Sequence, residues 1–215
     1  MRLVPCADSV RRYRLSSPVE RVCAKISHLE SIRRRLASGG LRAENPLQEI
    51  AIAQDLLQGG YRHQNVCKLL HAGKDDAWLY TVWEFCDGGD LQKICSKRGD
   101  PLTENEARKI FRDALRGLAY IHHRGYAHLD ISMENIMIRG TDAVLIDFGM
   151  TQRIRVPDVN VGCYGKRMYM HPMMFQHMGQ ANARQVMTGR LFLRLLLFSL
   201  LFSSSLSLSL SLSLS

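Results

Sequence analysis

The chain has 215 residues, of which 46% are hydrophobic and 23% charged, and its formal net charge is +9. This composition is ordinary for a globular protein and excludes the collagen-like, wholly disordered and multi-span membrane classes. The length allows one medium domain or two small lobes with a substantial core.

The positive charge is concentrated towards the C-terminus, where five Lys and Arg residues and no acid follow Asp158. Nucleic-acid-binding proteins more often cluster such charge on an aromatic-rich element, so we do not expect a nucleic-acid partner. The six cysteines include no Cys-x-x-Cys pair, which favours reduced intracellular thiols over a zinc site. The N-terminal sequence lacks the apolar core of a signal peptide, and we expect a cytoplasmic location.

Three elements are predicted before residue 101. Residues 21–26 and 78–85 are strand-like runs, the second rich in aromatic and β-branched side chains. The sequence Asn45-Pro46-Leu47-Gln48 has a capping residue, a proline at the first helical position and a glutamine that completes a capping-box pattern. It predicts a helix that runs to Leu57 and stops at Gly59-Gly60.

Residues 101–158 predict a long helix followed by a buried strand. Thr103 and Glu106 form a second capping box. Apolar residues then recur at helical spacing as far as Ile121, so we expect an amphipathic helix that ends near Gly125. The run at 143–148 is a short apolar strand that delivers Asp147 to a turn.

The last part of the chain, residues 185–215, is a run of leucines and serines that ends in strict Leu-Ser alternation. A membrane-spanning helix needs ~20 largely apolar residues, whereas Arg194 and the serines interrupt this one. We interpret the segment as a sequence artefact or a disordered tail. A weak membrane-associated segment is the alternative.

Three motifs in order resemble the protein-kinase family. His128-Leu129-Asp130 with Asn135 resembles the catalytic loop, and Asp147-Phe148-Gly149 is identical to the family's metal-binding motif. Lys25 in the early strand and Glu49 in the first capped helix match the family's ion pair. The Glu134-Asn135 ending of the loop makes the resemblance serine/threonine-type.

The resemblance implies phosphoryl transfer from ATP to a protein hydroxyl, with Mg²⁺ as the metal. Asn135 and Asp147 would hold the ion through hard oxygen ligands. Asp130 would orient the acceptor hydroxyl and take its proton. Lys25 would hold the α- and β-phosphates, with Glu49 fixing its ammonium.

Weaker matches extend the resemblance over roughly residues 20–173. His63 to Val66 resembles the turn after the family's C-helix. Glu84-Phe85-Cys86 resembles the hinge whose backbone would bind adenine, and Asp90 would contact the ribose. Trp83 falls at the gatekeeper position beside the adenine pocket and would narrow the back pocket, while Gly165 to Pro172 resembles the end of the activation segment.

The implied fold is α+β and two-lobed, with a small β-rich N-lobe, one C-helix and an incomplete, mostly helical C-lobe. We divide the chain into a divergent segment (1–19), the N-lobe (20–86), a partial C-lobe (87–180) and the low-complexity tail (181–215). Oligomeric state is left open.

The sequence also departs from the family in five places. The first glycine is Gly39, so no glycine-rich loop precedes Lys25. Either a shortened N-terminus or a degenerate lobe would explain its absence. Leu129 replaces an arginine that pairs with a phosphorylated activation segment, so we expect activity that does not depend on that phosphorylation. His171-Pro172-Met173 lacks the family's anchoring glutamate, and the C-lobe is short.

The fifth departure is an apparent exchange of two side chains. Ser132 stands where lysine is usual and Lys166 where threonine is usual. We hypothesise that Lys166 supplies the cation beside the transferred phosphate, with unrelated drift of the two positions as the alternative.

These departures leave more than one function open. We expect an ATP-dependent protein kinase that is weak or inactive as this chain. The alternatives are a pseudokinase-like nucleotide- or protein-binding scaffold and a membrane-tethered fragment. A metal site at His122, His123 and His128 is less expected than hydrogen bonds from these rings to the backbone.

Overall fold

The computed structural model describes residues 2–4, 10–14, 21–37, 45–60, 62–100 and 102–154, with side chains from residue 21 onward. Lys166, the segment from Gly165 to Met173 and the Leu-Ser tail lie outside the described residues. Among the helices that the structure describes, none has the length and apolar character needed to cross a membrane.

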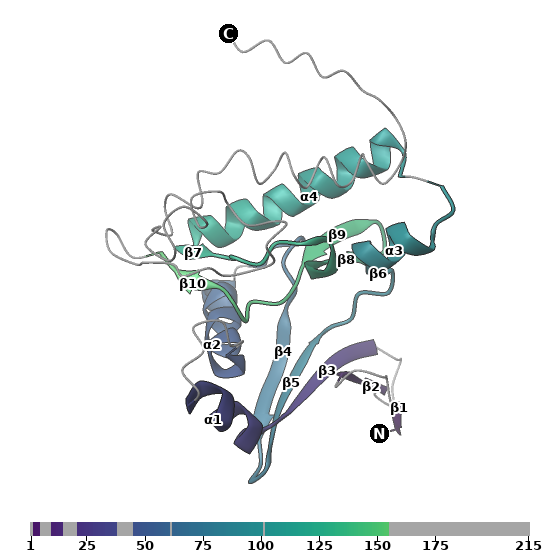
Figure 1. The fold of residues 1–215 in the computed structure, drawn as a ribbon. Coiled ribbons are helices and arrows are strands. Elements are labelled where there is room, and N and C mark those ends of the chain that lie inside the picture. Colours follow the sequence, from purple (N-terminus) through teal and green to yellow (C-terminus); the bar gives the residue numbers. More distant parts are fainter. Residues whose placement is uncertain are drawn as a thin grey trace.

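A five-stranded antiparallel sheet forms the smaller lobe (Figure 1). Its order is β1-β2-β3-β5-β4, and its strands are β1 (Arg2–Val4), β2 (Val10–Arg14), β3 (Arg21–His28), β4 (Leu69–Lys74) and β5 (Trp78–Glu84). Strand β3 pairs with β5 from Val22↔Glu84 to His28↔Trp78. The strands predicted at 21–26 and 78–85 are therefore confirmed as neighbours, and β1 and β2 bring residues of the 1–19 segment into the same sheet.

Two helices accompany this sheet, α1 (Leu29–Ala37) and α2 (Pro46–Leu57). Helix α2 has the predicted bounds, and the Asn45 side chain caps it by accepting from the backbone N–H groups of Leu47 and Gln48. The helix gives way to the short 3-10 turn η1 (Gln58–Gly60), where Gly59 has a φ of +76°. Helix α1 was not predicted, and it starts directly after β3 without a loop.

The larger lobe is built around α4 (Glu104–His123), which begins at the predicted Thr103–Glu106 capping box. Ala107, Ile110, Ala114 and Ile121 are buried on one face of α4, at the spacing expected of an amphipathic helix. The remaining elements are β6 (Gly89–Asp90), α3 (Leu91–Lys97), β7 (Tyr126–Ala127), η2 (Met133–Asn135), β8 (Ile136–Arg139), β9 (Asp142–Leu145) and β10 (Gln152–Arg153). The α+β, two-lobed fold is thus confirmed.

The turn at residues 63–67 joins the two lobes. Asn65 is fully buried, its Nδ2 donates to the Ala143 carbonyl at 2.8 Å, and its own carbonyl accepts from Leu145 N at 2.9 Å. Cys67 N in turn donates to the Leu145 carbonyl. This turn therefore binds the strand that leads to Asp147 to the end of the smaller lobe.

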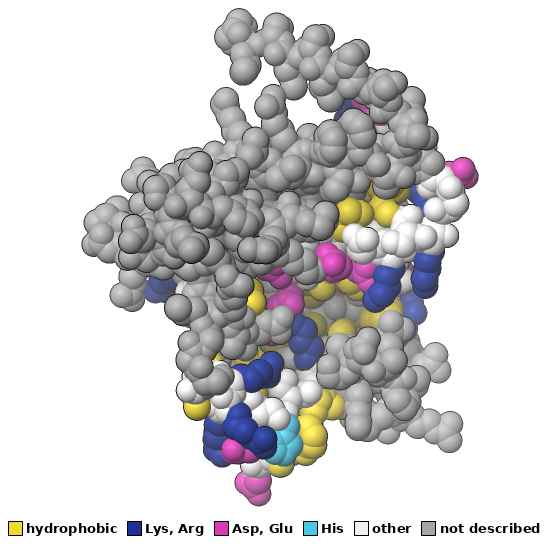
Figure 2. Space-filling view, viewed as in Figure 1, with side chains coloured by type: hydrophobic (Ala, Val, Ile, Leu, Met, Phe, Trp, Pro, Cys, Tyr) yellow, Lys and Arg dark blue, Asp and Glu magenta, His cyan; other side chains and the backbone are white. Residues whose placement is uncertain are grey.

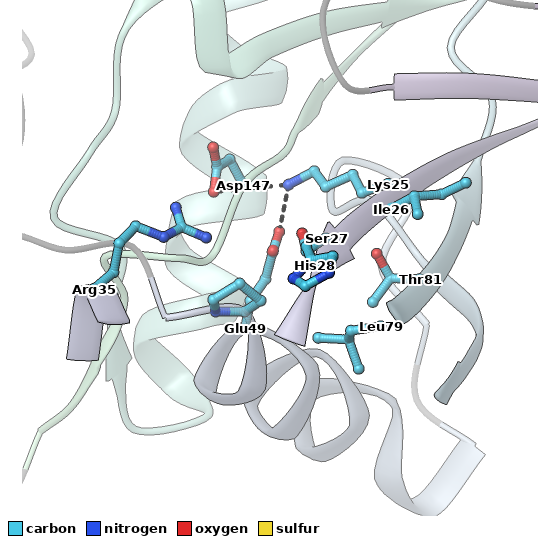
Figure 3. Close-up of a pocket in the computed structure, with 10 residues that line it drawn as sticks. Lys25, Ile26, Ser27, His28, Arg35, Glu49, Leu79, Thr81 and Asp147 are labelled. Carbon is cyan, nitrogen blue, oxygen red and sulfur yellow. Dashed lines mark hydrogen bonds and ion pairs between the residues drawn. The ribbon is translucent and has the colours of Figure 1, made fainter. Parts of the chain in front are cut away.

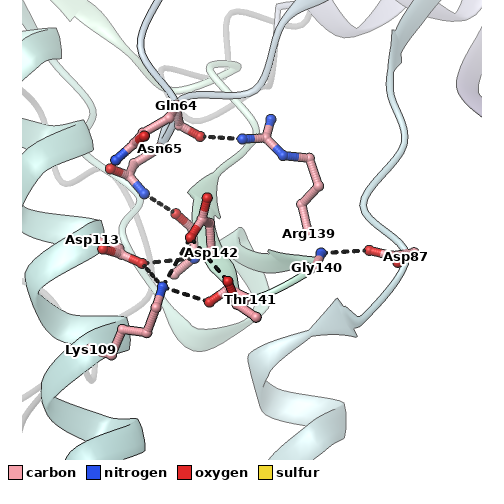
Figure 4. Close-up of polar contacts among 10 residues, drawn as sticks. Gln64, Asn65, Asp87, Lys109, Asp113, Arg139, Gly140, Thr141 and Asp142 are labelled. Carbon is pink, nitrogen blue, oxygen red and sulfur yellow. Dashed lines mark hydrogen bonds and ion pairs between the residues drawn. The ribbon is translucent and has the colours of Figure 1, made fainter.

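A buried carboxylate on α4 fixes the β8–β9 hairpin (Figure 4). Asp113 Oδ2 accepts from Lys109 Nζ at 2.7 Å and from the backbone of Ala143 at 3.3 Å. Lys109 also reaches Asp142 at 3.0 Å, and the hydrogen bond that its ammonium donates to Asp113 raises the pKa of Lys109. Because the carboxylate is nearly inaccessible, these partners offset its desolvation.

Candidate active site

Lys25, Glu49 and Asp147 come from three separate segments and meet at one point (Figure 3). Lys25 Nζ lies 2.7 Å from Glu49 Oε1 and 3.9 Å from Asp147 Oδ1. The Glu49 side chain is 7% exposed, whereas that of Lys25 is 34% exposed. A cation is thus held between a buried acid and a more accessible one.

Local sequence explains how these side chains are aimed. Val22 and Ala24 of β3 are buried. Because successive side chains of a strand point to opposite faces, Lys25 lies on the other, less buried face. Its ammonium also lies 5.5 Å from the centre of the Trp83 ring. Glu49 lies in the first turn of α2, where the partial positive charge of the helix end favours a carboxylate.

A cavity of about 360 Å³ opens beside the Lys25 ammonium. It lies between β3, β5, α1 and α2, and Asp147 closes one side (Figure 3). The space-filling view shows acidic and basic side chains close together in the middle of this face, between the sheet and the helical lobe (Figure 2). The volume is within the usual range for a small-molecule site.

Asp147 and Leu129 have left-handed backbone conformations, each with a φ of +64°. Both are bulkier than glycine, so each position carries conformational strain, a feature that clusters at functional sites. Asp147 Oδ1 also accepts from the backbone of Gly149 at 3.1 Å. The tight turn after β9 therefore presents the carboxylate towards Lys25 instead of continuing the strand.

Asp130 and Asn135 are joined within the loop that follows β7. Asn135 Nδ2 donates to the Asp130 carbonyl at 2.7 Å and to its Oδ2 at 2.8 Å. The backbone of Asn135 accepts from Ile146 N at 3.0 Å, one residue before Asp147. The two acids and the amide that were expected to act together are therefore on neighbouring, mutually bonded segments.

His128 packs beneath both acids. Its Nδ1 accepts from Asp130 N, its Nε2 contacts the Ile146 carbonyl, and its ring lies 5.7 Å from that of Phe148. Burial lowers the pKa of His128 to about 4. The described residues contain no group of three or more His, Cys, Asp or Glu that could hold a metal ion, and His128 serves the backbone instead.

The expected hinge, Glu84 to Cys86, begins at the last residue of β5. Glu84 N donates to the Lys68 carbonyl at 3.0 Å, and the Glu84 carboxylate pairs with Arg139 at 2.7 Å and Lys68 at 3.4 Å. Its side chain thus ties the smaller lobe to the β8–β9 turn, an arrangement that the sequence did not reveal. Cys86 is buried, and it is one of the four described cysteines, all free thiols.

Trp83 and Asp90 are two further positions that the sequence singled out. Trp83 is 4% exposed, and its ring centre lies 6.2 Å from that of Phe148. Asp90 caps α3 by accepting from Lys93 N at 2.8 Å, and its other carboxylate oxygen pairs with Lys93 Nζ at 3.0 Å. A ribose contact by Asp90 would therefore share this carboxylate with the helix cap.

Ser132 and Lys166 cannot be compared directly, because Lys166 lies outside the described residues. Ser132 is fully buried, and its Oγ has no hydrogen-bond partner among the described side chains and backbone. A buried hydroxyl without a partner costs free energy, so a donor or acceptor from elsewhere would be favourable here.

The sequence favoured bonds from the His128 ring to the backbone over metal binding, and the structure shows such bonds. Asp55 and Arg153 were not singled out, although the structure pairs them at 3.2 Å across 98 positions. The Asp55–Arg153 pair has no local signal.

Comparison with known proteins agrees with this geometry. The protein kinase domain family matches residues 9–207. Maternal embryonic leucine zipper kinase of Danio rerio is 38% identical over 121 residues, which cover 53% of this chain and 17% of that protein. Serine/threonine-protein kinase PLK4 of Nematostella vectensis is 33% identical over 98 residues (45% and 10%), and that of Drosophila grimshawi is 29% identical over 153 residues (70% and 19%). The chain thus spans less than a fifth of the length of these relatives, and the match over most of its own length shows that it belongs to the protein kinase domain family.

Proposed function

We propose that this chain binds Mg²⁺ and ATP and transfers the terminal phosphoryl group to a serine or threonine hydroxyl of a protein. The observation that carries the proposal is Lys25 Nζ, held 2.7 Å from a buried Glu49 and 3.9 Å from Asp147. The protein kinase family generally uses ATP and Mg²⁺ and acts on proteins.

Asp147 and Asn135 are the residues that would hold Mg²⁺. Asn135 uses its Nδ2 group for both contacts with Asp130, so its amide oxygen is the atom suited to a cation. Asp147 supplies a carboxylate oxygen, and hard oxygen ligands are what Mg²⁺ requires. When bound, the ion would neutralise charge on the ATP phosphates.

Lys25 would bind the α- and β-phosphates. Glu49 holds the ammonium beside the cavity, which limits the orientations of a long side chain before a nucleotide arrives. Such preorganisation reduces the entropy lost on binding. The hinge backbone at 84–86 would contact adenine, and Asp90 the ribose.

Asp130 would orient the acceptor hydroxyl and take its proton. Two hydrogen bonds from one Asn135 amide fix both the backbone and the carboxylate of Asp130. A base held in this way is in place before the substrate binds, as general-base catalysis requires. Lys166 would add positive charge beside the transferred phosphate, approaching the buried Ser132 hydroxyl.

The proposal is tested by phosphoryl transfer from γ-labelled ATP to casein, with a tyrosine-only copolymer as the specificity control. We expect labelling of casein and not of the copolymer. Because a positioned general base contributes about 10²–10⁴-fold, Asp130→Asn should lose at least ~10²-fold. Asp76→Asn, a change at an exposed turn acid, should retain full activity. Equal labelling by wild type and Asp130→Asn would contradict the proposal.

A second candidate is a nucleotide-binding scaffold that does not transfer phosphate. It is favoured by the segment that joins β1 and β2, residues 5–9, which contains no glycine. Without glycine the backbone there is less able to approach phosphates closely. Stabilisation by Mg-ATP without any labelling of casein would support this second function.

A further inference from the structure

The position of α2 decides whether Glu49 reaches Lys25, and two residues of α2 bond to the segment after Gly149. Gln48 Nε2 donates to the Thr151 carbonyl at 2.7 Å. Asp55 Oδ2 accepts from Arg153 Nη2 at 3.2 Å and from the Tyr126 hydroxyl. Gln48 and Asp55 are seven positions apart, so they lie on one face of the helix.

The partners of these two residues are themselves fixed to the larger lobe. Thr151 is fully buried, and its Oγ1 donates to the His128 carbonyl at 3.2 Å. Strand β10 pairs with β7 at Gln152↔Ala127 and Arg153↔Tyr126. Ile154 N donates to the Gly125 carbonyl at 2.7 Å. The segment 151–154 is therefore bonded to the larger lobe, and α2 contacts it through Gln48 and Asp55.

Tyr126 links the two charges. Its hydroxyl donates to Asp55 and accepts from Arg153 Nη2 at 3.0 Å and Nε at 3.3 Å, and the guanidinium lies 5.4 Å from the ring centre. The hydrogen bond from Tyr126, with help from Arg153, lowers the pKa of Asp55 against the opposing effect of burial. The pair is therefore ionised at neutral pH, and its hydrogen bonds are charge-assisted.

We propose that Gln48–Thr151 and Asp55–Tyr126–Arg153 form a latch that keeps α2 where Glu49 orients Lys25. The inference rests on the proposed function, since it concerns the same nucleotide site. The latch joins both ends of α2 to Thr151 and Arg153, which lie four and six positions after Asp147. Gln48, Asp55, Tyr126 and Arg153 are positioning residues, because they act on nucleotide through Glu49 and Lys25.

The test combines backbone hydrogen exchange of residues 46–57 with the Kd for Mg-ATP, in the whole chain. The double variant Gln48→Ala/Arg153→Gln removes both halves of the latch. It should exchange faster across α2, and its Kd should rise by about 5-fold or more, the usual lower range of coupling between sites. Arg153→Lys keeps the charge and should stay near wild type in both measurements.

Arg108→Gln is the matched control. It removes an exposed ion pair with Glu104 on α4, away from α2, and should change neither exchange of 46–57 nor nucleotide affinity. If the double variant does not fold, the exchanged pair Asp55→Arg/Arg153→Asp replaces it. That pair should restore slow exchange relative to Asp55→Arg alone.

The two measurements, hydrogen exchange and the Kd for Mg-ATP, distinguish failure of the latch from failure of the proposed function. The absence of Mg-ATP binding by wild type would contradict the proposed function, while the exchange measurement needs no nucleotide and still tests the latch. Exchange and Kd that remain at wild-type values in the double variant would overturn the latch. No restoration by the exchanged charges would overturn it as well.

Discussion

His128 Nε2 lies 3.1 Å from the Ile146 carbonyl, so one buried imidazole joins the loop after β7 to the segment that leads from β9 to Asp147. Its other nitrogen, Nδ1, accepts from Asp130 N at 3.3 Å. Because Nδ1 is an acceptor, the ring proton is on Nε2 and the imidazole is neutral. A protonated ring would lose the contact with Asp130.

This relationship predicts a loss of stability in mild acid. The pKa of His128 is about 4 in the folded protein and about 6.5 when unfolded, so the unfolded state binds the proton first as pH falls. Stability is retained above pH 6.5 and is lost as pH falls from 6.5 towards 4, by about 2 kcal/mol between pH 7 and pH 5. Urea unfolding at both pH values, with neutral His128→Gln as the comparison, measures this loss. Identical pH dependence of the two proteins would refute the assignment.

Glu49 is expected to act through Lys25. Glu49→Gln removes the charge that holds the ammonium at 2.7 Å, so phosphoryl transfer to casein should fall by roughly 10–100-fold through misplacement of Lys25. The exposed acid Glu30 on α1 pairs only at longer distances with Arg33 and Arg34 among the described side chains, and Glu30→Gln is the matched control. Steady-state kcat/KM for ATP measures the effect. Equal losses in both variants would show that Glu49 has no special role.

Gly117 allows α4 to approach the turn that joins the lobes. A Cβ at this position would lie 2.5 Å from the Asn65 carbonyl oxygen and 3.1 Å from Leu145 Cδ1. Gly117→Ala should therefore destabilise the fold by about 1–3 kcal/mol, as overpacking of a core does. Gly99→Ala is the control, since a Cβ there meets nothing within 4 Å. Chemical denaturation of the two variants should separate them, and equal midpoints would contradict the close approach.

The exchange of Ser132 and Lys166 has its own test. If Lys166 stabilises the transferred phosphate, Lys166→Ala should lower kcat by ~10²-fold or more, the size expected for one electrostatic donor. The measurement belongs in a full-length active homologue that carries the same serine and lysine, with KM for ATP followed in parallel. A change of less than a few-fold would mean that the two positions drifted independently.

Elements with strong end signals were predictable from the sequence. Helix α2 begins after Asn45-Pro46 and α4 after Thr103, because side chains next to each helix satisfy its first backbone N–H groups. Strand β9 and the turn at Asp147 followed from an apolar run that ends in an acid and a glycine. These are local effects, and local sequence carries them.

Other elements depend on distant partners. Helix α1 has one buried residue, Ile32, and its first N–H donates to the carbonyl of Ala77, almost fifty positions away. Strand β4 lacks regular alternation and contains a bulge between Leu69 and His71, so its strand character comes from pairing with β5. Sequence periodicity does not report such pairings.

The candidate site also has features that were predictable from the sequence and features that depend on distant partners. Lys25, Glu49, Asp130, Asn135 and Asp147 were found through family resemblance, and the structure brings Lys25 to Glu49 and Asp147, and Asn135 to Asp130. The role of the Glu84 carboxylate and the capping role of Asp90 were not foreseen, because both depend on side chains brought near by folding. Family resemblance predicts which residues form the candidate site, and the structure shows the hydrogen bonds and ion pairs that position them.

In the proposed function, Lys25, Asn135 and Asp147 form a nucleotide site that requires Mg²⁺. The direct measurement is the thermal midpoint of the whole chain with ATP, with and without Mg²⁺, for wild type and Asp147→Asn. Ligand that binds the folded state at 100 times its Kd stabilises it by about 2.7 kcal/mol, so the wild-type midpoint should rise with Mg-ATP and not with ATP and EDTA. Asp147→Asn should show little or no rise. A wild-type midpoint that does not move, or moves equally in the variant, would contradict the account.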